Sequence, residues 1–268
     1  MDKKAIVFVV DDNYISQARL AIHDVWISSG RQYPVYVIHA GRFCQESQDL
    51  LLKDADRLGI DLILFNAMSY SGMFSKLVQK NHISLIAYAK LLIGELLWTK
   101  EKITTAYYFD VDILVLRKLD DLFKIKPKKA IAAVDHNLNS EHRRLFGTDG
   151  RYINTGVFVA NLPRWNAINV MEKFKNVIDA DPNKLIYADQ DVIMLALEDE
   201  IEDLPVEYNF LLYKQWNPYI ETTMSPPWNS SVISPAIVHF AGVKKPWHPE
   251  SRDELSTQWR KRRMLLPS

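Results

Sequence analysis

The sequence has a single cysteine and no net charge. The first feature excludes a disulfide-stabilised fold, and the second argues against a nucleic-acid-binding protein. Among its 268 residues only Cys44 is a cysteine, so no disulfide can form within the chain. The loop-like surroundings of Cys44 favour a packing role over a nucleophilic one. Lys plus Arg and Asp plus Glu both number 33, and a chain without net charge has no general attraction to nucleic acid. We therefore expect no nucleic-acid partner.

Long hydrophobic runs are also missing. The apolar run at residues 5–10 ends at Asp11 and Asp12, which makes it too short for the core of a secretory signal. No run approaches the roughly 18 apolar residues of a membrane span, and we expect a cytoplasmic protein. The sequence also lacks internal repeats, low-complexity tracts and linkers, and its 48% of hydrophobic residues suffices for a sizeable core. We therefore expect one domain over residues 1–268, with a short basic tail at about 255–268.

The apolar pattern predicts an α/β fold. Short β-branched runs alternate with segments of helical spacing, and the order strand, helix, strand, helix, strand is typical of a doubly wound sheet. Clustered prolines predict a loop at 218–235. The predicted strands are 5–10, 35–39, 61–65, 106–109, 113–116, 130–134, 157–161 and 237–240, and the predicted helices are 15–27, 45–57, 84–98, 163–178 and 190–197.

Two aspartates follow the predicted strand 106–109. Asp110 and Asp112 are two positions apart, so their side chains point to the same side of an extended chain. Like charges placed together beside apolar residues repel each other unless a cation neutralises them. Mg²⁺ and Mn²⁺ bind carboxylate oxygens and keep positions open for phosphate. Taken by itself, however, the pattern fits a pair of solvated turn aspartates better than a metal site.

A second polar group follows the first predicted strand. Asp11, Asn13 and Tyr14 lie at its carboxyl end, where open α/β sheets bind ligands. A carboxylate and an amide can hydrogen-bond a base or a ribose, and a tyrosine ring can stack on a base. The alternative is a turn in which Asp and Asn cap the next helix. No Gly-x-Gly-x-x-Gly motif is present here, which argues against an NAD enzyme.

Two further segments carry candidate sugar-binding residues. Asn154 and Gly156 precede a predicted strand, and glycine allows the backbone to approach a ligand closely; the alternative is a plain turn. Asp189 and Gln190 precede a predicted helix. Asp189 is a good N-cap residue, and the alternative is that both side chains hydrogen-bond sugar hydroxyls.

The last polar segment is 238–248, which contains His239, Gly242 and Lys245. A backbone amide and an ammonium group suit a diphosphate. His239 could complete a metal site that the two aspartates begin. A lone histidine at the end of a short strand is nevertheless more often structural.

The order and spacing of these segments resemble glycosyltransferase family 8, the group that contains glycogenin and the bacterial lipopolysaccharide galactosyl- and glucosyltransferases. The similarity covers about residues 5–248, almost the whole chain. It rests on the segments 6–14, 82–84 with 88–91, 109–112, 154–157, 189–191, and 239–242 with 245–248.

The resemblance implies a GT-A fold, which is a Rossmann-like mixed, mainly parallel sheet flanked by helices. It implies Mn²⁺, or Mg²⁺, as cofactor and the retaining transfer of a hexose from UDP-galactose or UDP-glucose to a saccharide, glycolipid or glycoprotein acceptor. By position it implies metal ligands at Asp110, Asp112 and His239, a uridine pocket at Val9, Asp11, Asn13 and Tyr14, diphosphate contacts at Gly242 and Lys245, donor-sugar contacts at Asp135, Asn154, Asp189 and Gln190, and further substrate contacts at Val111 and Gly156.

One position departs from the family pattern. Lys90, which the resemblance implies as a donor-sugar or phosphate contact, stands where many members have an arginine. It offers a point charge in place of a bidentate fork, so that contact would be weaker or differently aimed. In the implied reaction, the metal and Lys245 stabilise the charge on departing UDP. Gln190 is a poor nucleophile, which favours substitution from the front face of the sugar. The alternative is a double displacement in which Asp189 or Asp135 is the nucleophile.

Two other functions are alternatives to glycosyl transfer. A nucleotidyltransferase also pairs aspartates around a metal, but it usually has a glycine-rich phosphate loop, and residues 9–14 contain no glycine. A non-catalytic binding module would be expected to lose the metal ligands, whereas Asp110, Asp112 and His239 are all present.

The basic tail has two interpretations. Four cationic side chains lie within 258–266 beside Trp259 and a Met-Leu-Leu sequence. The tail could make weak peripheral contact with the inner face of the membrane, which would suit a lipid-linked acceptor. It could equally be a solvated helix end that packs Trp259 on the domain.

Overall fold

The computed structural model describes residues 2–39, 43–74, 88–136, 152–181, 185–212 and 233–266. In these parts of the chain, the largest sheet has seven strands in the order β3-β2-β1-β4-β7-β6-β8. Strand β7 runs antiparallel to both neighbours, and the other pairs are parallel. The strands are β1 (Lys4–Val10), β2 (Val35–His39), β3 (Leu62–Asn66), β4 (Thr105–Phe109), β6 (Ile131–Asp135), β7 (Ile153–Asn161) and β8 (Ile201–Asp203). The predicted mixed, mainly parallel sheet is confirmed.

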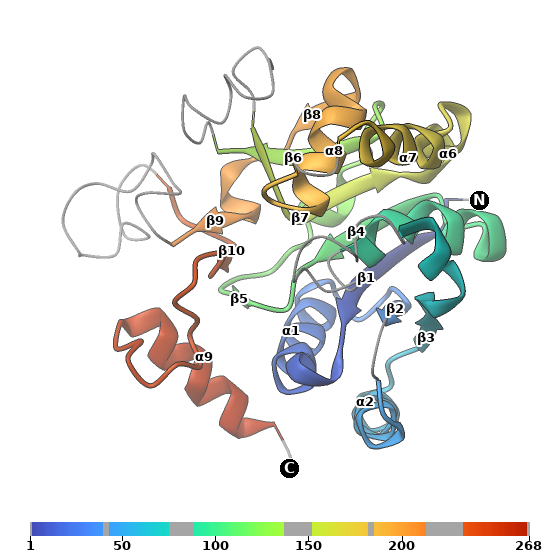
Figure 1. Cartoon of the computed structure of the whole chain (residues 1–268). Coiled ribbons are helices and arrows are strands. Elements are labelled where there is room, and N and C mark those ends of the chain that lie inside the picture. Colours follow the sequence, from blue (N-terminus) through green and yellow to red (C-terminus); the bar gives the residue numbers. More distant parts are fainter. Residues whose placement is uncertain are drawn as a thin grey trace.

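Helices cover both faces of this sheet (Figure 1). Helices α1 (Ile15–Ser28) and α2 (Gln45–Leu58) lie on one face, and α6 (Leu162–Ala167), α7 (Val170–Ala180) and α8 (Asp189–Leu197) lie on the other. Successive side chains of a strand point to opposite faces, so Ala5 and Val7 of β1 join one core cluster while Ile6 and Phe8 join the other. Because both faces are covered, β1 is apolar at almost every position.

A smaller sheet joins the C-terminal helix to the main body. It consists of β5 (Ile113–Val115), β10 (Ile237–His239) and β9 (Phe210–Leu211). Helix α9 (Glu254–Leu265) packs against α1, and its Trp259 is only 2% exposed within a third cluster of apolar side chains. Arg262 of α9 donates a hydrogen bond to Asp24 of α1 at 3.0 Å. The interpretation that the tail packs Trp259 on the domain is therefore confirmed, and membrane contact stays a prediction.

Within the described residues, five short 3₁₀ helices connect these elements, and no helix there has the length and hydrophobicity needed to cross a membrane. One more 3₁₀ turn, Lys90–Leu92, is followed by a π-helix at Gly94–Lys100. The connecting 3₁₀ helices are Asp12–Tyr14, Ala67–Phe74, Leu122–Lys124, Glu198–Glu200 and Val206–Tyr208.

Several predicted elements need correction. The helix predicted at 163–178 is two helices, because Asn169 has a left-handed φ of 51° that interrupts the α-helical path. Strand β7 begins at Ile153, so Gly156 lies within the strand and not before it. Strands β8 and β9 were not predicted. Ser84, the predicted start of a helix, and most of the predicted loop 218–235 lie outside the described residues.

Candidate active site

The topology brings the polar segments to one edge of the main sheet. Strands β1 and β4 are parallel neighbours with Phe8 opposite Phe109, so Asp11 and Asp110, which follow them, leave the sheet at the same edge. Asp112 directly precedes β5. His239 ends β10 and pairs with Ile113 of β5, which places it beside the two aspartates.

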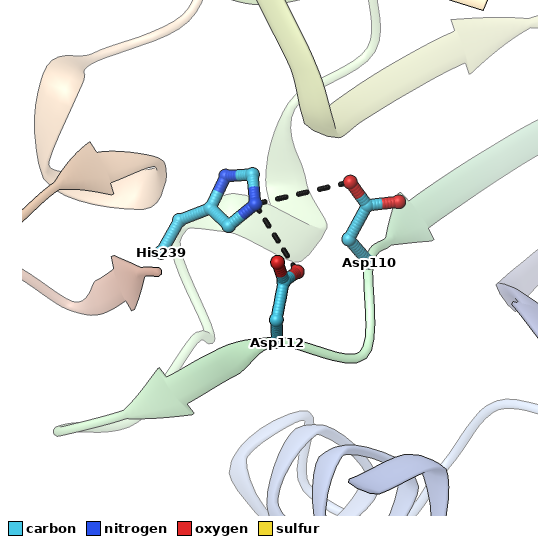
Figure 2. Close-up of side chains that lie close together, drawn as sticks. All are labelled: Asp110, Asp112 and His239. Carbon is cyan, nitrogen blue, oxygen red and sulfur yellow. Dashed lines mark ion pairs between the residues drawn. The ribbon is translucent and has the colours of Figure 1, made fainter. Parts of the chain in front are cut away.

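Asp110, Asp112 and His239 form a compact group (Figure 2). His239 Nε2 lies 3.2 Å from Asp112 Oδ1 and 3.8 Å from Asp110 Oδ2. The three side chains can each offer one ligand atom within 4.8 Å of the others. The three predicted metal ligands are thus neighbours in space, although His239 is distant in sequence from the two aspartates.

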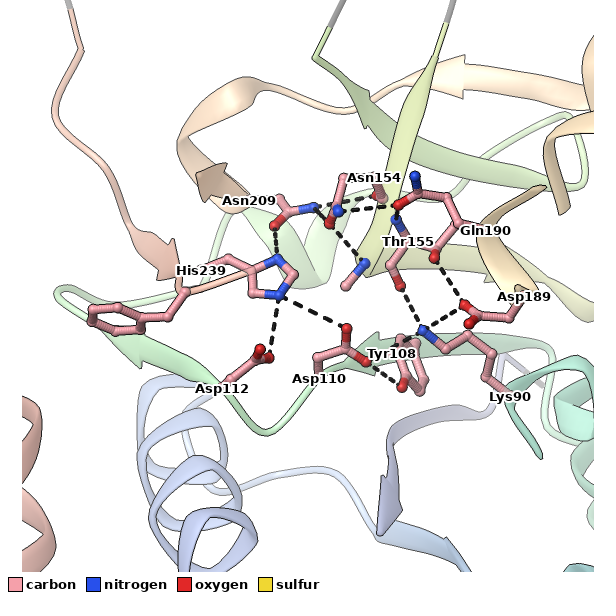
Figure 3. Close-up of polar contacts among 12 residues, drawn as sticks. Lys90, Tyr108, Asp110, Asp112, Asn154, Thr155, Asp189, Gln190, Asn209 and His239 are labelled. Atoms are coloured by element: carbon pink, nitrogen blue, oxygen red, sulfur yellow. Dashed lines mark hydrogen bonds and ion pairs between the residues drawn. The ribbon is translucent and has the colours of Figure 1, made fainter. Parts of the chain in front are cut away.

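Lys90 links two of the site's carboxylates (Figure 3). Its Nζ lies 3.3 Å from Asp110 Oδ1 and 2.9 Å from Asp189 Oδ2. Asp189 Oδ2 also accepts a hydrogen bond from the Thr155 hydroxyl at 3.1 Å. The predicted N-cap role of Asp189 is wrong, since Asp189 is the first residue of α8 and Ala188 is the N-cap.

Burial and charge act in opposite directions on this ion pair. Burial lowers the pKa of Lys90, but Asp110 and Asp189 raise it more, so the pKa lies above its ordinary value. Burial raises the pKa of Asp189, and Lys90 offsets only part of that increase. Lys90 is therefore charged at every pH at which the protein would be assayed, and Asp189 depends on it for a counter-charge.

Lys245 occupies the other side of the aspartate pair. Its Nζ lies 2.6 Å from Asp112 Oδ2 and donates to the carbonyl of Phe240 at 2.7 Å. Burial raises the pKa of Asp112, but His239 and Lys245 lower it more, and the result lies below the ordinary value. Asp112 is thus ionised, as a metal ligand must be.

A chain of amides lies behind His239. Asn209 Oδ1 is 2.9 Å from His239 Nδ1, and Asn209 Nδ2 donates to Asn154 Oδ1 at 2.9 Å. Asn154 Nδ2 donates to Gln190 Oε1 at 3.1 Å. Asn209 is fully buried. The hydrogen bonds therefore connect the predicted metal ligand His239 to the predicted sugar contacts Asn154 and Gln190.

Gly156 makes room for a protein side chain. A Cβ atom at this position would lie 2.1 Å from His239 Cε1 and 2.6 Å from His239 Nδ1, far inside van der Waals contact. The space that the sequence suggested for a ligand is thus filled by the imidazole of His239.

These residues line a cavity of about 210 Å³. A larger depression of about 320 Å³ lies against the π-helix and α6–α7, but among the described residues that line it the titratable ones are Glu95 and Glu172. The smaller cavity holds the chemistry, since it is lined by Lys90, Asp110, Asp112, Asn154, Thr155, Gly156, Tyr187, Asp189, Gln190, His239 and Ala241.

The predicted uridine-binding residues lie outside this lining. Asp11 accepts a hydrogen bond from the backbone N–H of Asn13 at 3.0 Å, so it caps the short helix Asp12–Tyr14 as the alternative interpretation expected. Tyr14 is 40% exposed, and its ring meets that of Trp247 edge-on at 6.0 Å. Tyr14 therefore stands beside the segment that carries Lys245, with part of its ring open to solvent.

The remaining predicted contacts are also apart from the cavity. The carboxylate of Asp135 accepts a hydrogen bond from the backbone N–H of Tyr152 at 3.1 Å, and Asp135 does not line the cavity. Val9 and Val111 are half-buried, and Gly242 is buried. Val9 packs on the core cluster on one face of the sheet and Val111 on the other.

Sequence reasoning missed three residues of the site. Thr155 and Tyr108 hold the carboxylates in place, since the Tyr108 hydroxyl donates to Asp110 Oδ1 at 2.5 Å. Asn209 was missed because it belongs to no polar motif and reaches the site only through the pairing of β9 with β10. An asparagine directly before a short apolar pair is the one signal that could have drawn attention to it.

Lys90→Met is expected to destabilise the fold by about 3–5 kcal/mol, because it leaves two partly buried carboxylates without their cation. Lys90→Arg keeps the charge and is expected to cost much less. Urea denaturation followed by circular dichroism measures both changes. The control is Lys124→Met, which breaks a solvent-exposed ion pair with Asp121 and should change stability little. Equal stability of Lys90→Met and the wild type would contradict the bridging role.

Comparisons with known proteins identify relatives of the chain. The family model described as glycosyl transferase family 8 matches residues 5–251. General stress protein A of Bacillus subtilis is 26% identical over 260 residues, covering 92% of this chain and 88% of that protein. A lipopolysaccharide 1,2-glucosyltransferase of Escherichia coli is 25% identical over 247 residues, covering 89% of this chain and 71% of that protein.

A solved structure extends the likeness to the fold. The crystal structure of the galactosyltransferase LgtC in complex with donor and acceptor sugar analogs superposes with a TM-score of 0.83 at 20% identity, covering 98% of this chain and 96% of that one. This confirms the predicted GT-A fold. With a family model that matches nearly its whole length, the chain belongs to glycosyl transferase family 8.

Proposed function

We propose that the protein is a metal-dependent, retaining hexosyltransferase that takes its sugar from UDP-galactose or UDP-glucose. The acceptor would be a hydroxyl group of a saccharide, glycolipid or glycoprotein. One observation carries the proposal: the group Asp110, Asp112 and His239 adjoins Lys245 on one side and the sugar-contact candidates on the other. Family membership and relatives named as a glucosyltransferase and a galactosyltransferase support it. We take residues 1–268 to act as one catalytic domain.

The donor atoms of the group fit a hard divalent cation. Neighbouring ligands around an octahedral ion with bonds of about 2.1 Å are about 3 Å apart, and opposite ligands about 4.2 Å apart. The distances of 3.2 and 3.8 Å from His239 Nε2 to the two carboxylates lie in this range. Two carboxylates and one imidazole suit Mn²⁺, with Mg²⁺ as the alternative. When bound, the ion would act as a Lewis acid that stabilises negative charge on the departing diphosphate.

The charges around the group indicate how UDP would be held. Lys245 lies against Asp112, so its ammonium could reach a diphosphate bound over the two aspartates. The backbone of Gly242 would make a supporting contact with the same diphosphate. Val9, Asp11, Asn13 and Tyr14 would bind uridine, because they leave β1 at the same edge of the sheet and Tyr14 stands beside Trp247.

The donor sugar would lie over the cavity formed by β7 and the start of α8. Asn154, Asp189 and Gln190 line that cavity and carry the groups that hydrogen-bond sugar hydroxyls. Lys90 would act mainly by keeping Asp189 and Asp110 in place. Asp135 and Val111 remain proposed substrate contacts outside the cavity. Gly156 is the residue that lets His239 approach β7.

The contacts of Asp189 and Gln190 favour substitution from the front face. Asp189 is engaged by Lys90 and by the Thr155 hydroxyl, which lowers its reactivity as a nucleophile, and an amide such as Gln190 is a poor nucleophile. In front-face substitution the C1–O bond to UDP breaks, the acceptor oxygen bonds to C1 from the same side, and the acceptor proton passes to the departing phosphate oxygen.

Gln190→Ala is expected to slow transfer on the order of 100-fold, as for loss of one oriented hydrogen-bonding group, without trapping a covalent intermediate. Intact-mass spectrometry during turnover measures any glycosylated enzyme. A hexose attached to Asp189 or Asp135 would contradict the front-face route and establish double displacement.

Calorimetry of UDP binding tests the proposed function against its rivals. We expect UDP to bind in the presence of Mn²⁺ and to bind much more weakly in EDTA. Addition of UDP-hexose and an acceptor should then release UDP. Binding of UDP without any turnover of UDP-galactose or UDP-glucose would favour a binding module, and pyrophosphate-dependent exchange of the nucleotide would favour a nucleotidyltransferase.

We further propose weak peripheral contact of α9 with an anionic membrane surface. Lys261, Met264 and Leu265 share one face of the helix, and Met264 and Leu265 are 80% and 84% exposed. Each basic residue near anionic lipid contributes roughly 1 kcal/mol of attraction. Trp259 is buried and takes no part.

The double variant Met264→Ser with Leu265→Ser is expected to lose most binding to anionic vesicles at low salt, because it removes the exposed apolar side chains. Co-sedimentation measures the bound fraction, and neutral vesicles are the control. Wild-type binding should also fall as salt rises. If the intact protein ignores anionic vesicles at low salt, α9 is not a membrane contact.

A further inference from the structure

Asn209 occupies a buried position between the candidate metal ligand and the sugar-contact residues (Figure 3). It is 0% exposed and lies between the short helix Val206–Tyr208 and strand β9. Besides its bonds to His239 and to Asn154 Oδ1, its Nδ2 donates to the backbone carbonyl of Asn154 at 3.3 Å. Every polar atom of this side chain is thus engaged within the site.

The partners of the amides determine their orientation. The carbonyl of Asn154 can only accept, so the group of Asn209 that faces it is the NH₂ group, and the Asn209 oxygen faces His239. The N–H of Gly156 can only donate, and it bonds Asn154 Oδ1 at 2.9 Å. The NH₂ group of Asn154 must then face Gln190.

The same reasoning extends to Gln190. The backbone N–H of Thr155 donates to Gln190 Oε1 at 3.4 Å, and Asn154 Nδ2 donates to the same oxygen. The amide oxygen of Gln190 is therefore turned toward β7. Reversal of any one amide would place two donors or two acceptors against each other, so the orientations of Asn209, Asn154 and Gln190 depend on one another.

The orientation of Asn209 also fixes which nitrogen of His239 carries a proton. An amide oxygen accepts only, so Nδ1 of His239 must donate to it. Nε2 is then the nitrogen directed at Asp110 and Asp112, and in the neutral ring it presents a lone pair. Partners of this kind on the non-ligating nitrogen set the tautomer and ring orientation of metal-bound histidines.

We propose that Asn209 is a positioning residue that holds His239 in its metal-ligating tautomer and, through Asn154, orients the amide of Gln190. One buried side chain thereby sets both the affinity for the metal and the geometry at the donor sugar. The inference rests on the proposed function, since it assigns the metal to Asp110, Asp112 and His239.

Two substitutions separate these two effects. Asn209→Ala removes both the acceptor for His239 and the donor to Asn154. Asn209→Asp keeps an acceptor for His239 Nδ1 but places a carboxylate oxygen against Asn154, which favours reversal of the Asn154 and Gln190 amides. The Mn²⁺ affinity of the protein alone is measured by the electron paramagnetic resonance of free Mn²⁺, and kcat is measured with a UDP-hexose.

Asn209→Ala is expected to lower the Mn²⁺ affinity about 10–100-fold, the usual effect of losing the partner of a ligating histidine. Asn209→Asp should recover most of that affinity. The kcat should stay low in both variants, on the order of 100-fold below wild type, because Gln190 is misplaced in both. A purely structural role would not produce this split between metal affinity and kcat.

The matched control is Asn161→Ala, which removes an asparagine that caps α6 and bonds the carbonyl of Pro127. It should lower stability and leave Mn²⁺ affinity unchanged. Wild-type Mn²⁺ affinity in Asn209→Ala, or equal losses of affinity in the Ala and Asp variants, would overturn the positioning role of Asn209. Either result would leave the proposed metal site standing. A wild-type protein that binds Mn²⁺ no better than Asp112→Ala would overturn the metal site itself.

Discussion

Asp112→Ala, and its isosteric counterpart Asp112→Asn, are expected to reduce metal-dependent turnover on the order of 1000-fold or more. Asp112 lies 3.2 Å from His239 and 2.6 Å from Lys245, so its charge serves both the proposed cation and the lysine that would clamp the diphosphate. Loss of a metal's Lewis acidity costs several kcal/mol of transition-state stabilisation. The measurement is UDP release from UDP-hexose at saturating Mn²⁺.

Both variants of Asp112 should keep the circular dichroism spectrum of the wild type. The Asp112 side chain lies outside the main sheet, and its ion pairs with His239 and Lys245 lie at the cavity. Asp110→Ala should behave in the same way. The control is Asp121→Ala, which removes an exposed carboxylate that is paired with the exposed Lys124. Full activity of an Asp112 variant in excess EDTA would contradict the metal assignment.

Gly156→Ala is expected to impair both the stability of the protein and the candidate metal site. The added methyl group would overlap His239 Cε1 at 2.1 Å, and the imidazole cannot yield freely because it is buried and bonded to Asn209. Overpacking of this kind typically costs about 1–3 kcal/mol of stability. Displacement of a site residue by about 1 Å can lower turnover by about 100-fold. Mn²⁺ affinity and turnover should therefore both fall.

The control for Gly156→Ala is Gly94→Ala, which overpacks the core at a distance from the site. Its methyl group would lie 2.8 Å from Trp165 Cε3, so it should also lower the melting temperature. The Mn²⁺ affinity of the folded protein should be unchanged in this variant. If Gly156→Ala retained wild-type Mn²⁺ affinity, His239 would not be the ligand whose position Gly156 protects.

Much of the architecture could be predicted because its strands are buried on both faces. Such strands appear as continuous apolar runs, and β1, β2 and β4 were predicted within one residue of their observed bounds. Asp110 and Asp112 were recognisable because charged residues interrupt an apolar stretch. Their neighbour His239 could be grouped with them only through resemblance to a family, since 126 residues lie between Asp112 and His239.

Other features depend on contacts that a local pattern does not contain. Asn169 interrupts a helix through its backbone conformation while the apolar spacing continues across it. Lys90 was taken for a ligand contact, yet its nearest charged partners are the protein's own carboxylates. The role of Gly156 follows from a side chain that arrives from β10. Each of these is set by tertiary packing.

The most direct test of the central claim is UDP release from UDP-galactose and UDP-glucose, measured with Mn²⁺ and with excess EDTA, for the wild type and Asp112→Asn. We predict that the wild type releases UDP from one of these donors with Mn²⁺ only, and that Asp112→Asn releases almost none. Equal release in EDTA, or equal release by Asp112→Asn, would contradict a metal-dependent hexosyl transfer at this site.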